Sequence, residues 1–312
     1  MLKGIACKIG STLAFAFMLA LVKVYSAYSV AELVFFRSFF ALFILVFWLL
    51  MRGDFPRALH TRWFGGHLVR SLAGVGSMFC VFTAYGLLPL ADATAIGYAG
   101  PLVVVVLAAL LLGEKVHATR WAAVVVGFSG VMVMLWQHLG FTTGEAAAGG
   151  LARTGLGALL AFSGALLVAV AMIQTRRLTR TEDTGAIVFY FQSTTTLASL
   201  IIVLAADYWP SAWPGAALVQ SQAWIWPEGR DWAPLIAIGL LGGVGQILMT
   251  QSYRFADASV VSCFDYTSMI WALILGFVLF SETPSPIAIV GASIIAAGGL
   301  FAILTERHAK RM

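Results

Sequence analysis

Residues 90–113 read LADATAIGYAGPLVVVVLAALLLG, and no charged side chain occurs between Ala93 and Gly113. An α-helix rises 1.5 Å per residue, so about 20 apolar residues cross the hydrocarbon core of a bilayer. Residues 93–113 meet that length. The run LVVVVLAALLLG (102–113) also lacks the alternation that a transmembrane strand requires. The stretch therefore predicts one membrane-spanning helix.

The composition of the whole chain excludes a water-soluble domain. Of its 312 residues 61% are hydrophobic and 11% are charged, and the mean hydropathy is +0.93. Soluble domains carry about 25% charged residues, because their surfaces need polar groups. Disordered chains are excluded by the same figures, since they are poor in apolar residues. The three cysteines, Cys7, Cys80 and Cys263, lie too far apart to indicate a disulfide framework or a thiolate metal site.

Charge-free stretches predict ten membrane-spanning helices. Seven stretches have at least 21 residues without Asp, Glu, Lys or Arg, namely 71–91, 93–113, 121–144, 154–175, 184–206, 232–253 and 283–305. Three shorter stretches, 9–22, 38–51 and 266–281, reach that length only if they take charged residues from their edges. Backbone groups in hydrocarbon must be satisfied within each segment. We therefore expect an all-α integral membrane protein.

The distribution of Lys and Arg predicts that both termini lie in the cytoplasm. Of the 19 basic residues, only Arg153 and Arg230 fall in outer connections, and Lys23 and Arg37 fall near outer ends of spans. The other 15 fall in inner segments, as the positive-inside rule requires. The net charge of +5 is thus a topology signal, and we expect no nucleic-acid partner. A cleavable signal peptide is an alternative for the first span, but nine further spans favour a retained helix.

The opening stretch recurs later in the chain. LADATAIGYAG (90–100) matches FADASVVSCFD (255–265) at an offset of 165, and Glu114 matches Glu282 at an offset of 168. Five predicted spans separate the two copies, which is an odd number, so the copies have opposite orientations in the membrane. Inverted repeats are typical of secondary transporters, whose binding sites lie near the midplane between the halves.

The two halves resemble the EamA units of the drug/metabolite transporter superfamily. Each has an Ala-Asp-Ala turn, a later Gly-Glu or Ser-Glu pair (113–114, 281–282) and a Gly-rich closing helix. The resemblance covers 8–138 as a first repeat and 155–304 as a second. It implies ten helices in the bacterial inner membrane, arranged as two inverted five-helix repeats around a central cavity. FFRSFFA (35–41), GLLPLADATAIGYAGPL (86–102) and CFDYTSMIWAL (263–273) are most similar to members for riboflavin or S-adenosylmethionine uptake.

From this resemblance we expect a secondary transporter of a small polar organic metabolite, with riboflavin-type vitamin uptake as the first hypothesis. Uptake of S-adenosylmethionine and export of amino acids or other metabolites are alternatives, and an integral membrane enzyme is a remote one. Protons as coupling ion, the direction of transport and a monomeric or homodimeric state are left open. No Gly-x4-Gly-Lys-Ser/Thr motif occurs and the five His residues lack metal spacing. We therefore expect no cofactor, no metal and no catalytic residue.

Ionisable residues inside the spans are the first candidates for the substrate site. A charge at the centre of a spanning helix costs about 2.5–3.5 kcal/mol and usually faces a cavity or a partner. Asp265 lies eight residues after Asp257 and is expected to couple protons, to pair with a cation, or to bond a neighbouring helix. Arg37 is expected to pair with Glu32, with Asp265 or with an anionic part of the substrate. Glu32 alternatively caps its own helix.

Uncharged polar residues complete the expected cavity, although each could instead hold helices together. They are Tyr98, Gln192, Gln246, Tyr266 and Trp271. Three basic positions are assigned to the membrane boundary: Lys23 is expected to snorkel outward, and His67 and Arg70 to anchor the inner side. The run GLLGGVG (239–245) predicts a close contact between helices.

Overall fold

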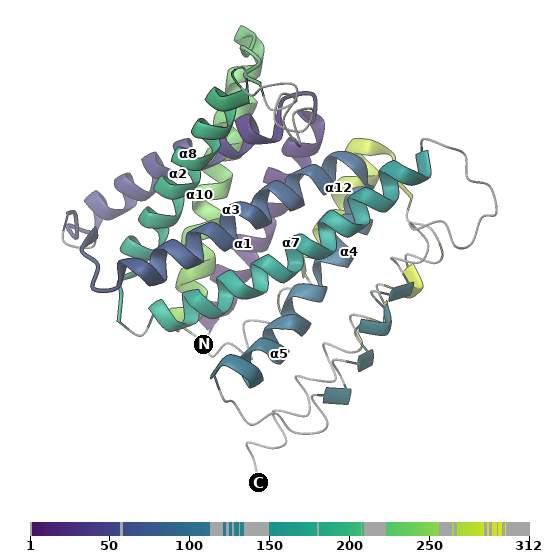
Figure 1. Cartoon of the computed structure of the whole chain (residues 1–312), viewed down its shortest axis with the longest axis horizontal. Coiled ribbons are helices and arrows are strands. Elements are labelled where there is room, and N and C mark those ends of the chain that lie inside the picture. Colours follow the sequence, from purple (N-terminus) through teal and green to yellow (C-terminus); the bar gives the residue numbers. More distant parts are fainter. Residues whose placement is uncertain are drawn as a thin grey trace.

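The computed structural model describes residues 2–56, 59–112, 150–179, 181–206, 208, 223–255, 264 and 267–283, with short pieces of 121–133 and 286–297. All regular structure in these residues is helical (Figure 1). The long helices are α1 (Leu2–Val24), α2 (Val30–Met51), α3 (Phe64–Leu87), α7 (Gly150–Leu178), α8 (Thr184–Ala206) and α10 (Trp232–Phe255). The shorter ones are α4 (Leu90–Gly97), α5 (Ala99–Leu112), α12 (Thr267–Phe280) and the 3-10 turn η2 (Gly229–Asp231).

The six long helices are long and apolar enough to cross a membrane, and α12 is a shorter apolar helix. They coincide with the predicted spans at 9–22, 38–51, 71–91, 154–175, 184–206 and 232–253. Most residues of the predicted spans 121–144 and 283–305 lie outside the described part of the chain. The described residues therefore form an all-helical, multi-pass membrane protein.

The predicted fourth span, 93–113, is divided into two helices. α4 ends at Gly97, Tyr98 follows with φ −67° and ψ −7°, and α5 begins at Ala99. The N–H of Tyr98 donates to the carbonyl of Ala95 at 3.1 Å, three residues back. Pro101 has no N–H, so the carbonyl of Gly97 lacks its usual helical partner. The predicted span is therefore interrupted at Tyr98, close to the Gly100-Pro101 pair that frees backbone groups there.

The largest helix contacts join a helix before residue 113 to a helix after residue 149. α3 packs along α7, α1 packs along α10, and α2 packs on both α8 and α10. α4 packs on α12 and α7. Figure 1 shows α3 and α7 running side by side across the centre of the molecule. The two halves of the chain are therefore interleaved, and the core lies between them.

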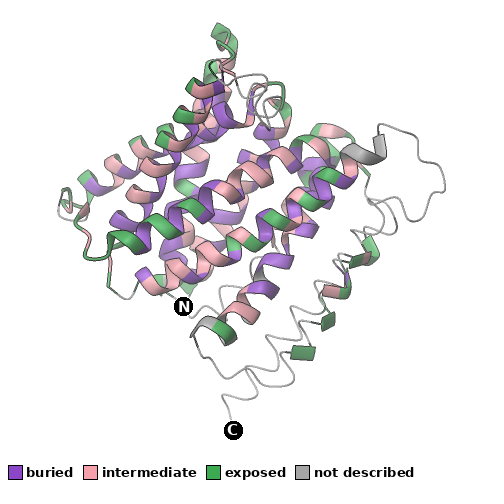
Figure 2. Ribbon diagram, in the orientation of Figure 1, coloured by how far each residue is buried: buried purple, intermediate pink, exposed green. Residues whose placement is uncertain are grey.

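Buried residues gather where helices meet, and exposed residues lie on the outer faces (Figure 2). Many of the exposed residues are large and apolar. Phe47 on α2, Ile201 on α8 and Phe277 on α12 are 62%, 65% and 65% exposed. Soluble monomers rarely expose so many large apolar groups together. Hydrocarbon tails solvate such a surface without penalty, so the exterior fits a bilayer.

The glycine-rich run of α10 allows this helix to touch α2 closely. A Cβ at Gly239 would overlap the Cβ of Phe40 and lie 2.8 Å from the carbonyl oxygen of Phe36. A Cβ at Gly243 would lie 3.0 Å from the Cα of Ala41. Real side chains do not approach backbone atoms so closely. The predicted close helix contact at 239–245 is confirmed.

Gly239→Ala should destabilise the protein, because α2 and α10 must separate to admit the methyl group. Overpacking of this kind costs about 1–3 kcal/mol. The measurement is the thermal unfolding midpoint of the detergent-purified protein. Gly65→Ala in α3 is the control, since its new Cβ would meet only the Trp63 Nε1 at 3.8 Å. Alanine favours a helix over glycine, so the control should not lower the midpoint. An unchanged midpoint for Gly239→Ala would contradict the packing described.

Candidate functional site

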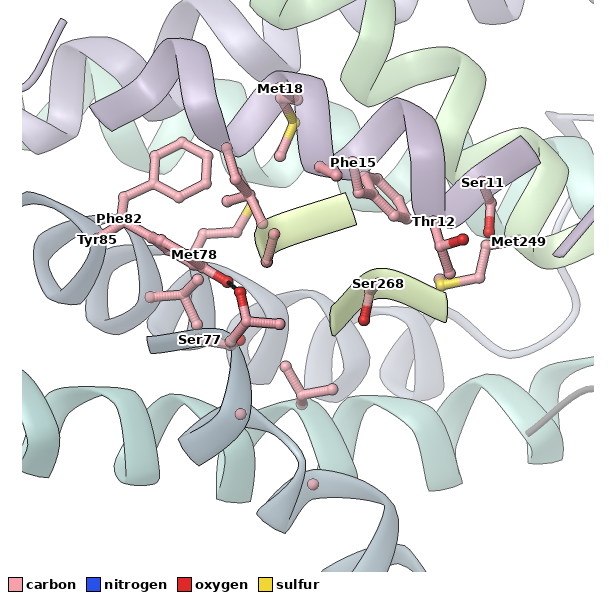
Figure 3. Close-up of a pocket in the computed structure, with 18 of the residues that line it drawn as sticks. Ser11, Thr12, Phe15, Met18, Ser77, Met78, Phe82, Tyr85, Met249 and Ser268 are labelled. Atoms are coloured by element: carbon pink, nitrogen blue, oxygen red, sulfur yellow. Dashed lines mark hydrogen bonds between the residues drawn. The ribbon is translucent and has the colours of Figure 1, made fainter. Parts of the chain in front are cut away.

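A cavity of about 340 Å³ lies at the centre of the helix assembly. Its wall draws on α1, α2, α3, α4, α5, α7, α10 and α12, and so on both halves of the chain. In Figure 3, Phe15 and Met18 reach toward it from α1, and Met78, Phe82 and Tyr85 from α3. Small-molecule sites commonly enclose about 300–1,000 Å³ behind a mostly apolar wall. The cavity therefore has the size for one small metabolite.

Hydroxyl groups bridge the two halves across the cavity. The Tyr98 hydroxyl and the Ser268 Oγ lie 2.6 Å apart and join α4 to α12. The Thr12 Oγ1 lies 2.8 Å from the Thr267 Oγ1 and joins α1 to α12. The polar groups that line the cavity are Lys8, Ser11, Thr12, Arg37, Ser77, Tyr85, Thr94, Tyr98 and Ser268. Hydroxyl groups can both donate and accept, so much of this lining can adapt to a polar solute.

Arg37 brings a charged group into the cavity from α2, although only 4% of its surface is exposed. Its NH1 donates to the Oε1 of Gln192 on α8 at 2.7 Å, and its Cζ lies 5.5 Å from the centre of the Phe191 ring. Gly242 gives it room, because a Cβ there would lie 2.9 Å from the Arg37 Nε. Among the described residues, no carboxylate forms an ion pair with Arg37.

Arg70 of α3 is a second buried guanidinium beside the same ring. Its Cζ lies 3.8 Å from the centre of Phe191, and its Nε donates to the Oγ1 of Thr175 on α7 at 3.2 Å. His67 lies one turn earlier and is 3.8 Å from Glu182, with both side chains about 1% exposed. Residues three apart share a helix face, and this face of α3 packs on α7 and α8. The expectation that Arg70 and His67 anchor the membrane boundary is therefore wrong.

An ion pair joins the end of α1 to the residues after α12. The Nζ of Lys23 lies 2.9 Å from the Oε1 of Glu282, with the side chains 16% and 22% exposed. The Oε2 of Glu282 accepts from the N–H of Leu90 at 2.8 Å, and the Lys23 Nζ donates to the carbonyl of Leu88. We call these four residues the closure. The expected outward snorkelling of Lys23 is wrong, because the carboxylate and the carbonyl hold it inside the protein.

The carboxylate of the closure also caps a helix of the other half. α4 begins at Leu90 after Pro89, and no side chain next to it in sequence caps its first N–H groups. Glu282 supplies the missing acceptor from 192 residues further along the chain. A negative charge at a helix start is stabilised by the helix dipole as well as by the hydrogen bond. The Ala-Asp-Ala turn of the first half thus depends on an acidic residue of the second half.

The backbone conformation of Ser281 directs the side chain of Glu282 toward the closure. Ser281 has φ 54°, in the left-handed region that favours glycine, and the N–H of Glu282 donates to the carbonyl of Gly276 at 3.0 Å. A non-glycine residue in that region costs about 1–2 kcal/mol. Strain of this kind persists where surrounding contacts outweigh it, as the ion pair and the helix cap do here. The sequence carries glycine at the matching position 113 of the first half.

Two further contacts hold the 223–231 segment at the same end of the molecule as the closure. The N–H of Ile225 donates to the Oε2 of Glu32 at 3.1 Å, at the start of α2. The hydroxyl of Tyr28 donates to the Oδ2 of Asp231 at 2.6 Å. This hydrogen bond to a carboxylate raises the pKa of Tyr28 to about 12. Tyr28 therefore stays protonated, and its bond stays intact, across the physiological pH range.

Those residues expected at the substrate site that the structure describes fall into three groups. Arg37 and Tyr98 line the cavity, and Gln192 contacts Arg37 from α8. Glu32 is buried at the start of α2, where Ser29 caps the helix, and it forms no ion pair with Arg37. The third group is outside the lining that the structure describes: Gln246 is buried in α10 and Trp271 is partly buried in α12.

Asp265 and Tyr266 lie outside the described residues, directly before α12. Their roles at the site stay predictions. The sequence expectations missed Lys8, Ser11 and Thr12, which line the cavity from α1. These three stand at i, i+3 and i+4, which is a polar stripe on an otherwise apolar helix and could have been found by its period.

The EamA-like transporter family matches this chain over residues 2–136 and 155–304. The chain belongs to the EamA-like transporter family. This EamA protein is 29% identical to the pseudopaline exporter CntI of Pseudomonas aeruginosa, over 94% of its own length and 93% of the exporter. It is 26% identical to an S-adenosylmethionine uptake transporter of Rickettsia felis, over 89% of this chain and 84% of the relative. It is 27% identical to a riboflavin transporter of Rhizobium johnstonii, over 81% and 75%.

A solved structure shows the same fold. That chain is 22% identical to this EamA protein, with a TM-score of 0.61 over 96% of this chain and 98% of its own. Family and relatives confirm the expectation of a secondary transporter for small metabolites. The cavity between the halves is the candidate place for that metabolite.

The closure should show energetic coupling between its two charged side chains. In a double-mutant cycle of Lys23→Met and Glu282→Gln, the unfolding free energies should deviate from additivity by about 1–3 kcal/mol, since the pair is mostly shielded from water. The matched control is the exposed pair Arg52 and Asp54, 3.0 Å apart, whose coupling should not exceed about 1 kcal/mol. Additive effects at Lys23 and Glu282 would show that the ion pair itself contributes nothing to stability.

Proposed function

We propose that this EamA protein is a secondary carrier that moves a small polar metabolite across the bacterial inner membrane by exposing its central cavity to one side at a time. The observation that carries the proposal is a cavity whose wall comes from both halves and includes the buried Arg37. A space between two bundles changes its access when one bundle rocks against the other. A charged group buried in a spanning helix is a mark of such a pathway.

We further propose that 8–138 and 155–304 are two inverted repeats. The helix contacts support this, because exchanging α1 with α7 and α3 with α10 converts the α3–α7 contact into the α10–α1 contact. The same two-fold exchange, with α2 for α8 and α5 for α12, leaves the α2–α8 contact unchanged and converts the α5–α7 contact into the α12–α1 contact. With the basic residues on the inner side, both termini are cytoplasmic and the closure lies on the outer side.

A second closure on the inner side follows from this repeat. Glu114 matches Glu282, and the second Ala-Asp-Ala turn (256–258) matches the turn that opens α4. Glu114 and this turn both lie outside the described residues, so a closure formed by them stays a prediction from the repeat. Alternating access then means that one closure is intact while the other is open, so the cavity never connects both sides.

The choice of metabolite is guided by the wall of the cavity. Aromatic and thioether side chains suit a carbon skeleton or ring, and the hydroxyls and Arg37 suit polar substituents. Uptake of a riboflavin-type vitamin was the first hypothesis from the sequence, and uptake of S-adenosylmethionine and export of a metabolite are the alternatives. The relatives include carriers for each of these, so the test must assume neither substrate nor direction.

Counterflow into liposomes tests the carrier proposal. Purified protein is reconstituted, the vesicles are loaded with an unlabelled compound, and entry of the labelled compound is followed for riboflavin, S-adenosylmethionine and single amino acids. We expect transient accumulation of at least one compound, and none in protein-free vesicles. Chemical conversion of a compound by the protein in detergent, without counterflow, would indicate a membrane enzyme instead.

The same vesicles test proton coupling, for which Asp265 is the candidate on the sequence alone. With an imposed pH gradient, Asp265→Asn should lose accumulation of the transported compound and keep the wild-type unfolding midpoint, because an amide cannot carry a proton. Asp265→Glu, which keeps the carboxylate, is the control. Wild-type accumulation by Asp265→Asn would remove Asp265 from the mechanism.

A further inference from the structure

The positive charge of Arg37 has no counter-charge among the residues that the structure describes. The side chain is 4% exposed, lies inside a spanning helix and faces the cavity. Its NH1 is bonded to Gln192, and its Nε has no hydrogen-bond partner. A buried charge without compensation is strongly destabilising, by several kcal/mol. An anionic group that enters the cavity would supply that compensation.

Gln192 holds Arg37 without cancelling its charge. A guanidinium only donates hydrogen bonds, so Gln192 must turn its amide oxygen toward Arg37, and its Nε2 is left without a partner. Glutamate has the same length and would form an ion pair at the same 2.7 Å contact. The uncharged residue therefore keeps a full positive charge at the cavity wall, and Gln192 acts as a positioning residue.

Arg70 strengthens the positive potential at this wall. It lies 3.8 Å from the centre of the Phe191 ring, whose other guanidinium neighbour is Arg37 at 5.5 Å. Its NH1 is buried and has no hydrogen-bond partner in the described structure. Charges interact strongly where water is scarce. Two buried guanidinium groups at one ring thus favour an anion more than either group would alone.

We propose that the substrate of this carrier bears an oxyanion, a carboxylate or a phosphate, that docks on Arg37 inside the cavity. The inference rests on the proposed carrier function and names the class of its substrate. An oxyanion would accept the free guanidinium N–H and restore charge balance, and charge-assisted bonds are the strongest hydrogen bonds in proteins. The hydroxyls of Thr12 and Ser77 and the side chains of Phe15 and Met18 would receive the rest of the molecule.

This assignment separates the candidate substrates. S-adenosylmethionine and free amino acids carry a carboxylate, whereas riboflavin carries no acidic group that ionises at neutral pH. The geometry therefore favours an acid-bearing metabolite over the neutral vitamin that the sequence resemblance suggested first.

The test measures binding of simple oxyanions to the purified full-length protein in a nonionic detergent. Succinate and inorganic phosphate are titrated separately at constant ionic strength, and the unfolding midpoint is recorded. A ligand that binds only the folded protein raises that midpoint saturably, and we expect this with succinate or with phosphate in the wild type. Arg37→Gln should weaken the apparent affinity about 10-fold or more, as expected for a lost charge-assisted bond. Arg52→Gln, at the exposed end of the same helix, should not change it.

Gln192→Glu keeps the test decisive if Arg37→Gln folds poorly. The substitution keeps the size of the side chain and adds an ion pair to Arg37, so the protein should fold while the free charge disappears. We expect it to weaken oxyanion binding about as much as Arg37→Gln does. A wild type that responds to neither probe, or unchanged binding in Gln192→Glu, would overturn the proposal.

The counterflow assay distinguishes a failure of the oxyanion proposal from a failure of the proposed carrier function. Counterflow of a metabolite without Arg37-dependent oxyanion binding would leave the carrier function standing and remove the anion site. Arg37-dependent binding without counterflow of any compound would support the site and remove the carrier function.

Discussion

An ionised side chain in hydrocarbon is costly unless a partner, a backbone group or a hydrated space receives it. The buried charges that the structure describes meet this constraint in different ways. Lys23 has the carboxylate of Glu282 and a backbone carbonyl, and Glu282 in turn has the N–H of Leu90. Arg37 has one amide oxygen and the cavity. The contacts of these groups therefore mark the positions of the closure and of the cavity.

The closure and the cavity share one residue. Leu90 donates its N–H to Glu282 and also lines the cavity. The bond between Tyr98 and Ser268 joins α4 to α12 further along. α4 ends at Gly97, and Tyr98 separates it from α5.

Stretches without charge were enough to place the long helices, because length and apolar composition decide what crosses a bilayer. Arg37 and Tyr98, which the sequence singled out as a charge inside a span and as a residue beside Gly100-Pro101, both line the cavity. The sequence did not predict the rotation of each helix about its own axis, and so did not predict which side chains face the protein interior. That rotation depends on which neighbour the helix packs against, and for that reason Lys23, His67 and Arg70 were assigned to the wrong surroundings.

The chemistry of the cavity depended even more on contacts that are distant in sequence. Arg37 and Gln192 are 155 residues apart, and only their meeting shows that the guanidinium is held by a neutral group. The cap that Glu282 provides for α4 spans 192 residues. A repeat in the sequence predicts that such contacts exist between the halves, but the partners follow only from the packed structure.

The account depends most on a hydrated space between the two halves, and cysteine accessibility measures that directly. Cys7, Cys80 and Cys263 are replaced, and a single cysteine is then introduced by Ser77→Cys in the cavity or by Ile201→Cys on the outer face of α8. A charged thiol reagent is supplied on either side of the membrane, because thiolates form and react only in contact with water. The account predicts labelling at position 77, slowed by the transported compound, and none at position 201. No labelling at position 77 from either side, or equal labelling at both positions, would contradict it.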